Sequence, residues 1–418
     1  MLEHCTHHAY KAVLSSGLES ADLSNAPKFR RNAAGAVEVS LTPSERDLLG
    51  LVFRRGPQTQ GGLADHTGLT QQSVSRLVAG LQQRGLVVVG DKAAAGRRGY
   101  PSSAAALNAE HARSAGLSIM ADAVSLCICD FAGNVLAEAS GRLPSMTVSQ
   151  VMDWTEARLA ELAGPDLSDL VGLGVGISGS FIGVRPGFNT PFSLNEWADR
   201  DIEALFAEQL GLPTQADNDG NVAALGESLL GVGRWAPSFA YLYIATGVGG
   251  GIVLNGEVWR GRHGNAGEFA GGLPTNVYPF PTLELLRQLT ARQGLSFETV
   301  SELVANYDDT WPSIDDWLAR VRDSFSIIAS NASAILDLDA VVLGGLIPRA
   351  LAERVIEVVE LYDQKRRMVP RPVARLVPAE APGDVTAFGA ALMPLQRAFF
   401  ASPARLRPGR AETEGVKV

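Results

Sequence analysis

Apolar positions recur at helical spacing along the stretch that begins at Leu41. The stretch predicts three helices: one capped by Thr42 and ended by Gly56, a short one that ends at Gly68, and one that runs from Thr70 to Gly85. In the third helix, positions i, i+3, i+4 and i+7 form one apolar stripe, made of Val74, Leu77, Val78 and Leu81. That stripe must face the core of a small domain, which leaves the opposite side of the helix in solvent.

The segment after the third helix predicts a β-hairpin. A valine-rich strand at 86–90 leads into a turn rich in glycine, alanine and arginine, and a second apolar segment returns at 102–108. Three helices followed by a hairpin is the order of a winged helix-turn-helix. We assign this domain to residues 41–108.

The next 290 or so residues alternate strands and helices, which predicts an α/β body over 112–400. Its first apolar segment, 115–139, predicts a hairpin of two long strands that turns at 132–134. Further strands are expected at 170–178, 238–261 (a second hairpin) and 340–345, and helices at 148–163, 199–210, 282–293, 297–305, 313–336, 348–361 and 385–400.

The two ends of the chain, 1–40 and 401–418, lack sustained periodicity and are expected to be loose tails. The first tail contains His4, Cys5, His7 and His8. These residue types can bind metals, but a structural zinc site needs four ligands held by a folded core. We therefore expect no metal site there.

The composition is that of a globular protein: 418 residues, 46% apolar and 19% charged. Three cysteines exclude a disulfide scaffold and suit a reducing compartment. No apolar run reaches the about 18 residues that a membrane span needs, and residues 1–10 do not resemble a signal peptide. We expect a cytoplasmic protein that has no membrane partner.

The net charge of −9 argues against nucleic-acid binding until its distribution is considered. Residues 41–101 contain eight basic and four acidic residues, a balance of +4, which leaves −13 on the rest of the chain. A basic domain is thus attached to an acidic body, and only the small domain carries the charge that DNA would attract.

The exposed side of the third helix carries residue types that read DNA. Glutamine can pair with adenine, arginine with guanine or phosphate, and serine with either. The predicted contacts are Thr70, Gln71, Gln72, Ser75 and Arg76, together with Arg97 and Arg98 at the tip of the wing. A small helical domain with a solvated charged face is the alternative interpretation.

Two glycine clusters raise the question of nucleotide binding. Gly174, Gly176 and Gly179 spell G-x-G-x-x-G, but they lie within a strand that no helix follows, so the dinucleotide fingerprint lacks its context. The cluster at 246–251 joins two strands, and its backbone N–H groups can cradle phosphate or simply form a tight hairpin.

The stretch 217–221, Asp-Asn-Asp-Gly-Asn, is expected to form a loop before an apolar helix. A carboxylate there can accept a proton from a substrate hydroxyl, and a neighbouring amide can hold sugar hydroxyls. An Asx-rich helix cap is the alternative.

Three segments, at 217–227, 244–268 and 340–345, resemble the ROK family (repressors, open reading frames, kinases), and the resemblance covers roughly residues 112–395. It implies a two-lobed, actin-like ATPase fold (ribonuclease H-like) with a sugar cleft between the lobes. The family's sugar contacts fall on Asn218, Asp219, Glu268 and Glu284, and in kinase members the residue at Asp219 is the catalytic base. The matching phosphate-binding positions, expected to be vestigial, are Thr246, Gly247, Gly249, Gly344 and Gly345.

The chain departs from the family at the first phosphate loop. Family kinases carry Asp-x-Gly-Gly-Thr-Lys there, whereas this chain has Ser118-Ile-Met-Ala-Asp-Ala123. Phosphoryl transfer depends on positioning and charge neutralisation around the phosphates, so side chains in place of glycine and a carboxylate at Asp122 predict that ATP is not used. The family's zinc motif is missing as well, and Cys127 and Cys129 are expected to pack in the core. No cofactor is therefore expected.

These features predict a sugar-responsive, DNA-binding transcriptional regulator, most readily a repressor of carbohydrate-use genes. Its expected partners are a double-stranded DNA operator, a sugar or sugar phosphate, and further copies of itself in a homodimer or tetramer. A ROK-type sugar kinase with Asp219 as base is the alternative, and a ligand-binding protein whose winged domain contacts another protein is a third possibility.

Overall fold

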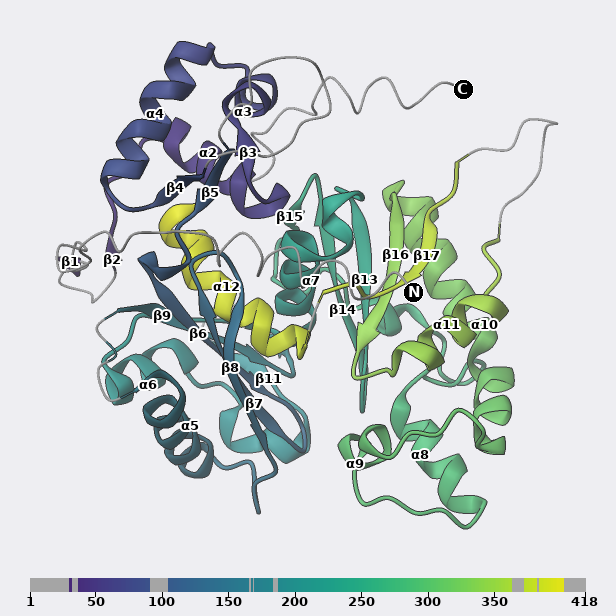
Figure 1. Ribbon diagram of the computed structural model, residues 1–418. Helices are drawn as coiled ribbons and strands as arrows, with labels where there is room; N and C mark the ends of the chain where they lie inside the picture. Colours follow the sequence, from purple (N-terminus) through teal and green to yellow (C-terminus); the bar gives the residue numbers. More distant parts are fainter. Residues whose placement is uncertain are drawn as a thin grey trace.

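The computed structural model describes residues 30–31, 37–90, 104–164, 167, 169–182, 187–362, 372–381 and 383–401 (Figure 1). The predicted wing-tip contacts Arg97 and Arg98 lie outside the described residues. Within the segment expected to be a loose N-terminal tail, β1 (Arg30–Arg31) pairs antiparallel with β2 (Val37–Glu38). Two residues per strand are too few to leave a periodic signal in a sequence.

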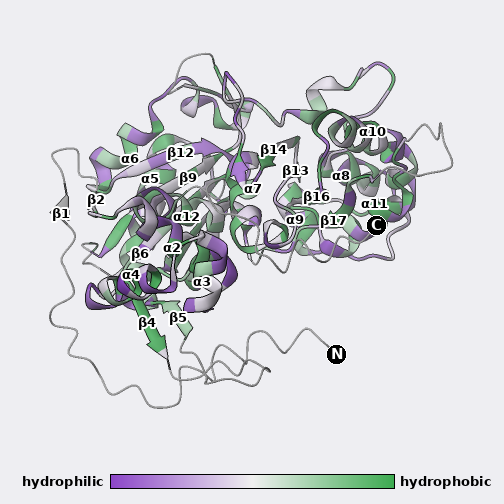
Figure 2. Cartoon of the chain, turned by 90° about the horizontal axis from the view of Figure 1, so that it is seen from above, coloured by the Kyte–Doolittle hydropathy of each residue, from purple (hydrophilic) through white to green (hydrophobic). Residues whose placement is uncertain are grey.

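The N-terminal domain has the predicted order of elements. Its helices are α2 (Pro43–Arg55), α3 (Gln60–Thr67) and α4 (Gln71–Gln83), and its sheet has the order β3 (Gln58–Thr59), β5 (Ala104–Leu107), β4 (Val87–Gly90). The predicted caps are confirmed: Thr42 forms a capping box with Glu45, and Thr70 accepts from the backbone of Ser73 at 3.2 Å. Figure 2 shows hydrophilic residues along the outer sides of α3 and α4.

The first lobe of the body is a five-stranded sheet of order β12-β9-β6-β7-β8. Its strands are β6 (Arg113–Ile119), β7 (Val124–Asp130), β8 (Val135–Gly141), β9 (Leu170–Ile177) and β12 (Thr214–Asn218). Helices α5 (Val148–Ala163) and α6 (Ile202–Leu210) cover one face (Figure 1). Short elements on this lobe are η2 (Ala109–His111), β10 (Ser180–Phe181), β11 (Phe188–Asn189) and η3 (Phe192–Trp197).

The predicted two-stranded hairpin over 115–139 is wrong in one respect: the segment forms three strands. The chain turns at Met120–Ala123, where the Met120 N–H donates to the Ala123 carbonyl at 2.9 Å, and turns again at Asn134. The first turn carries no glycine or proline, and Met120 is buried. An apolar residue at the turn made two strands look like one continuous run.

The second lobe is a mixed sheet of order β15-β14-β13-β16-β17 backed by helices. The strands are β13 (Phe239–Ile244), β14 (Val248–Leu254), β15 (Glu257–Val258), β16 (Ala340–Gly345) and β17 (Arg375–Pro378). The helices are α8 (Leu283–Arg292), α9 (Val300–Ala305), α10 (Pro312–Leu336) and α11 (Arg349–Val358), with η4 (Val232–Arg234) and η5 (Phe269–Gly272) as single turns. Apolar side chains from β13, β16 and these four helices form one core.

Two helices, α7 (Asp219–Leu230) and α12 (Val385–Phe399), lie side by side between the two sheets. α12 packs on β6 and β9 of the first lobe, and α7 packs on β13 and β14 of the second (Figure 1). Their backbones approach so closely that a Cβ at Gly389 would lie 2.2 Å from the Val222 carbonyl oxygen. Only glycine permits that approach.

The N-terminal domain packs against the C-terminal end of α12. The Phe53 ring of α2 lies 4.5 Å from the Phe400 ring, and the Phe131 ring lies 4.7 Å from that of Phe399. The Ala401 N–H donates to the Arg46 carbonyl at 3.2 Å. These groups belong to one apolar core that is continuous from α2 through α12, so the two domains share buried surface.

We expect Gly389→Ala to destabilise the body, because the added methyl group has no room between α7 and α12. The cost should reach or exceed about 1–3 kcal/mol, as for other overpacked cores, and thermal unfolding followed by circular dichroism measures it. Gly80→Ala on α4 is the matched control, since its Cβ would meet nothing within 4 Å and a helix interior gains about 0.5–1 kcal/mol from the change. Equal melting temperatures for the two variants would contradict this packing.

Candidate functional site

Asp217 and Asn218 end strand β12, and Asp219 opens helix α7. The loop predicted at 217–221 is therefore wrong: strand passes directly into helix. Asn218 is the helix cap, since its side-chain oxygen accepts from Gly220 N at 2.8 Å, while its amide donates to the Gly179 carbonyl. The Asx-cap alternative thus holds for Asn218 without excluding a role in binding.

Asp219 is buried and held in place by the neighbouring strand. The Ser178 hydroxyl donates to Asp219 Oδ2 at 2.6 Å, and the Gly220 N–H donates to Oδ1 at 2.8 Å. Burial, helped by the charge of Glu268, raises the pKa of Asp219 to about 6 against the lowering effect of the Ser178 hydrogen bond. A carboxyl that titrates so near neutrality can accept a proton or a hydrogen bond from a hydroxyl.

The loop that carries Glu268 comes from the second lobe and lies against the first. Arg260 Nε donates to Asp217 Oδ2 at 2.6 Å, an ion pair in which the carboxylate is buried. Asn265 accepts from Phe181 N at 2.7 Å and donates to the Phe181 carbonyl at 2.8 Å. Burial also raises the pKa of Glu268. Asp219, which directly follows β12 of the first lobe, thus feels the charge of Glu268 on a loop of the second lobe, and Asn218 lies beside Asp219.

Glu284, the fourth predicted sugar contact, is engaged elsewhere. It lies in the first turn of α8 and binds Arg287 Nε at 2.7 Å and Gln288 Nε2 at 2.9 Å. The Arg287 guanidinium lowers the pKa of the Glu284 carboxyl. Of the four predicted residues, Asn218 and Asp219 are adjacent at the start of α7, Glu268 interacts with Asp219 through its charge, and Glu284 has its partners elsewhere.

The five predicted phosphate-loop residues occupy two neighbouring turns of the second lobe. Thr246 and Gly247 connect β13 to β14, and a Cβ at Gly247 or Gly249 would meet nothing within 4 Å. Gly344 and Gly345 end β16, which runs parallel to β13, so both turns lie at the same edge of the sheet. The Gly345 N–H is already used, because it donates to the Tyr241 hydroxyl at 2.9 Å.

The turn at 120–123, where the sequence predicts a changed phosphate loop, contacts the opposite lobe. Asp122 Oδ1 accepts from the Ser301 hydroxyl at 3.1 Å and Oδ2 accepts from the Ser301 N–H at 3.3 Å. Ser118 is fully buried, and its hydroxyl has no hydrogen-bond partner among the described residues. These contacts could not be predicted from the sequence, because Asp122 and Ser301 are distant along the chain.

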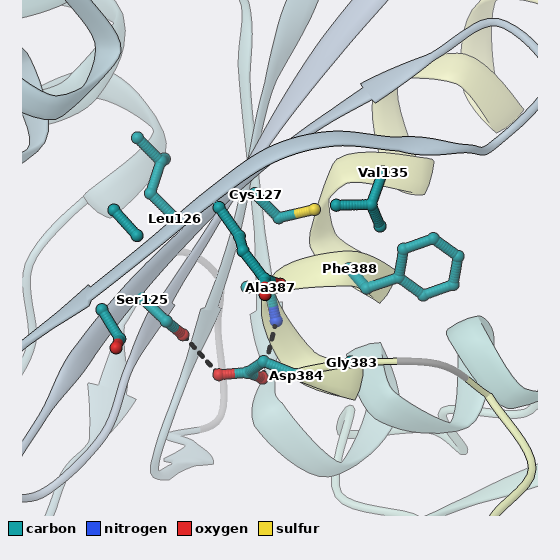
Figure 3. A pocket seen from close by; sticks show the side chains of 11 residues that line it. Ser125, Leu126, Cys127, Val135, Gly383, Asp384, Ala387 and Phe388 are labelled. Carbon is teal, nitrogen blue, oxygen red and sulfur yellow. Dashed lines mark hydrogen bonds between the residues drawn. The ribbon is translucent and has the colours of Figure 1, made fainter. Parts of the chain in front are cut away.

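A cavity of about 400 Å³ lies between β7, β8 and the start of α12 (Figure 3). The Ser125 hydroxyl donates to Asp384, which caps α12 through the N–H groups of Thr386 and Ala387. Cys127 and Phe388 line its apolar side. None of the predicted site residues lines this cavity, so the cavity and the site around Asp219 share no residue.

The predicted DNA contacts that the structure describes lie on one side of α4. Thr70, Gln71, Gln72, Ser75 and Arg76 are all exposed, whereas Val74, Val78 and Leu81 are buried. The Thr70 hydroxyl serves as the cap of the helix as well, since it accepts from the Ser73 N–H. The first turn of α4 therefore presents polar and basic side chains outward beside a helix N-terminus, where phosphate is welcome.

No group of three or more potential ligands among the described residues is placed to bind a metal ion. The two cysteines of β7, Cys127 and Cys129, are buried with their Sγ atoms 3.5 Å apart and are both free. Within the same part of the chain, no helix is long and apolar enough to cross a membrane.

The described residues form a winged-helix domain on a two-lobed α/β body. Family models give it a name: residues 114–276 match the ROK family, and residues 39–98 match the MarR family. The chain carries a ROK-family domain behind a MarR-type winged-helix domain, which confirms the resemblance inferred from its motifs.

Three curated proteins illustrate the range of relatives. The uncharacterized protein y4fQ of Sinorhizobium fredii is 26% identical over 86% of this chain and 92% of that protein. A glucokinase of Halalkalibacterium halodurans is 37% identical over 41% of this chain, and a xylose repressor of Bacillus spizizenii is 25% identical over 54% of it. The last two matches span only 54% and 59% of those proteins.

Two solved structures share the fold. A ROK family transcriptional regulator, a homologue of the E. coli MLC protein, has a TM-score of 0.57 at 17% identity over 87% of this chain and 96% of that chain. A ROK family glucokinase from Streptomyces griseus, in complex with glucose and AMPPNP, has a TM-score of 0.56 at 20% identity over 67% of this chain and 98% of that chain. One transcriptional regulator and one glucokinase thus share the fold of this chain's two-lobed body.

The raised pKa of Asp219 predicts a pH-dependent stability. Its folded-state pKa, about 6, lies above the ordinary 3.8, so the stability that the neutral carboxyl contributes is present below about pH 4 and is lost as the pH rises through 6. Asp219→Asn should therefore raise the melting temperature at pH 8 by the equivalent of roughly 1–3 kcal/mol, and the gain should shrink towards pH 4.5.

Thermal unfolding at the two pH values checks this, with Asp217→Asn as the control. Asp217 forms the ion pair with Arg260 and accepts from Asn221 Nδ2 at 3.0 Å, so its neutralisation should destabilise the protein at pH 8. An Asp219→Asn variant that is less stable than the parent at pH 8 would show that the charged Asp219 carboxylate does not destabilise the folded protein at that pH.

Proposed function

We propose that the chain is a sugar-responsive, DNA-binding transcriptional regulator, in the first instance a repressor of carbohydrate-use genes. The observation that carries the proposal is helix α7: its first residue is Asp219 of the candidate sugar site, and its last turn lies against the DNA-binding domain. A ligand at one end of such a helix can bias the position of the domain at the other end.

DNA binding is assigned to the exposed side of α4. Gln71, Gln72 and Ser75 have the donors and acceptors for base edges, and Arg76 can bind guanine or phosphate. Arg97 and Arg98 on the wing are further proposed contacts. In a homodimer, two such helices would enter successive major grooves about one helical turn apart. The xylose repressor and the ROK family regulator among the relatives support this reading.

The proposed ligand is a sugar or sugar phosphate bound by Asn218, Asp219 and Glu268, with Glu284 as a further contact. A sugar hydroxyl can donate to the Asp219 carboxylate, and the amide of Asn218 can bridge neighbouring hydroxyls. Because Glu268 lies on a loop of the second lobe and Asn218 ends strand β12 of the first, one sugar that bound both would join the lobes. Glu284 would have to leave Arg287 to take part.

Two helix ends would transmit the ligand's effect to the DNA-binding domain. Helix α7 has 12 residues, a length of about 18 Å, and the Ser228 carbonyl in its last turn accepts from Arg54 Nη1 at 3.5 Å. Burial lowers the pKa of Arg54 to about 10. Phe53, which lies on α2 next to Arg54, packs on Phe400 at the end of α12. A shift of the α7–α12 pair would therefore move α2, and with it α4.

Loss of kinase activity is proposed from the turn at 118–123. Met120 and Ala121 place side chains where a kinase of this family has glycines, and Asp122 adds a negative charge at a position that must approach phosphate. The retained glycine turns at Gly247–Gly249 and Gly344–Gly345 are then vestigial. No nucleotide or metal cofactor enters this proposal.

Arg76→Ala should weaken operator binding by about 1–3 kcal/mol and relax its sequence preference if Arg76 reads a base. Fluorescence anisotropy with the promoter region of the chain's own gene measures the change across salt concentrations. Arg292→Ala, on α8 of the body, removes the same charge as a control and should leave binding unchanged. Equal affinities for the two variants would refute the assignment of α4.

A bound sugar should weaken operator affinity by about 5–150-fold, the usual range of allosteric coupling. A thermal-shift screen of hexoses, pentoses and their phosphates identifies the ligand, because specific binding stabilises the native state. Asp219→Ala should abolish both the thermal shift and the release of DNA. Operator affinity that stays constant at a saturating concentration of a stabilising sugar would sink the proposal.

A ROK-type sugar kinase remains the second candidate function, and the raised pKa of Asp219 favours it, since a general base works best near the ambient pH. The 37% identity to a glucokinase points the same way. Incubation with ATP, Mg²⁺ and the sugar panel distinguishes the kinase from the regulator. ATP turnover that Asp219→Asn abolishes would favour the kinase, whereas we expect no turnover.

A further inference from the structure

We propose that Asp122 is a built-in anion that latches the two lobes of the body together. It lies in the turn between β6 and β7 of the first lobe, and its partner, Ser301, lies in the first turn of α9 in the second lobe. In Figure 1, α9 stands opposite the ends of these strands, on the side of the molecule away from the DNA-binding domain. This inference concerns the body alone and holds whether or not the chain binds DNA.

The contact has the chemistry of a helix cap supplied by another lobe. The first N–H groups of a helix have no partner within the helix, and a carboxylate beside them gains from the helix dipole. Thr299 of α9 itself accepts from Glu302 N at 3.1 Å, while Asp122 Oδ2 takes the Ser301 N–H at 3.3 Å and Oδ1 takes its hydroxyl at 3.1 Å. Two charge-assisted hydrogen bonds, both partly buried, therefore cross from lobe to lobe.

The contact between Asp122 and Ser301, called the latch below, joins the lobes at a second point along the end of the sheet that carries the candidate sugar site. Strands β6, β9 and β12 are neighbours in register, with Ile119 and Asn218 both paired to Ile177. Interlobe bonds at the β12 end already include Arg260 with Asp217 and Asn265 with Phe181. Asp122 adds a bond two strands further along, so the lobes are joined on both sides of β9.

The position of the latch explains why a carboxylate is useful there. A turn that contacted a nucleotide phosphate would close the lobes only when the nucleotide was bound. The Asp122 carboxylate supplies a permanent negative group in that turn and satisfies α9 directly. The lobes are then held together before any ligand arrives, and the site formed by Asp219 and Glu268 is assembled in the ligand-free protein.

Hydrogen–deuterium exchange of the full chain, without sugar or DNA, tests the latch. Asp122→Asn keeps the shape of the side chain but removes its charge, and it should speed exchange in both the 118–124 and 300–305 peptides. We expect about tenfold in α9, equivalent to the loss of about 1.4 kcal/mol. Glu208→Gln, on an exposed face of α6 in the same lobe, removes the same charge and should change neither peptide.

Ser301→Ala provides the second arm, because it removes one of the two donors and leaves the backbone N–H in place. It should speed exchange of both peptides by less than Asp122→Asn, and the double variant should match Asp122→Asn alone. Unchanged exchange in 300–305 after Asp122→Asn, or an effect confined to the 118–124 peptide, would overturn the latch. Because the readout needs no operator and no sugar, it stands apart from any failure of the proposed regulatory function.

Discussion

The close contact between α7 and α12 is the constraint on which the rest of the structure depends. A Cβ at Gly389 would lie 2.2 Å from the Val222 carbonyl, and one at Gly220 would lie 2.5 Å from the Gly250 carbonyl. Glycines at these crossings let two helices fit between two sheets. That fit places Asp219 at one end of the pair and the aromatic contacts of the DNA-binding domain at the other.

The candidate site is the product of the same constraint. Asp219 is buried where strand β12 runs without a break into α7, and its carboxyl accepts hydrogen bonds from Ser178 and from the adjacent backbone. The second lobe closes over it through Arg260, Asn265 and Glu268. A buried carboxyl of this kind costs stability, as is common for groups at functional sites.

Periodicity and caps predicted most of the fold. Helix α5 was expected at 148–163 and occupies Val148–Ala163, and Thr42, Gly56 and Gly68 delimit helices as predicted, because these signals are local. The errors arose where local and long-range signals conflict. The turn at Met120–Ala123 was missed because it has no glycine or proline and begins with a buried apolar residue. Strand β12 was missed because its polar end, Asp217 and Asn218, is satisfied by partners distant in sequence.

The residues of the candidate site also divide into those that local signals predicted and those that only long-range contacts reveal. Asn218, Asp219 and Glu268 stand out as polar residues in otherwise apolar or glycine-rich segments, and the family resemblance joined them. Ser178, Arg260 and Asn265 could not be found in this way, because common polar residues acquire their roles only from the approach of the two lobes. Glu284 was expected on the resemblance alone, and its ion pair with Arg287 is a local i, i+3 contact of α8 that the motif did not reveal.

The most direct test of the account is the reciprocity of its two ligands. If the sugar and the operator bias the same two-state body, the operator must weaken sugar binding by the same factor by which the sugar weakens operator binding. Isothermal titration of the stabilising sugar into free protein and into the protein–operator complex measures that factor. The account predicts a sugar dissociation constant about 5–150-fold larger in the complex; identical constants in the two titrations would contradict it.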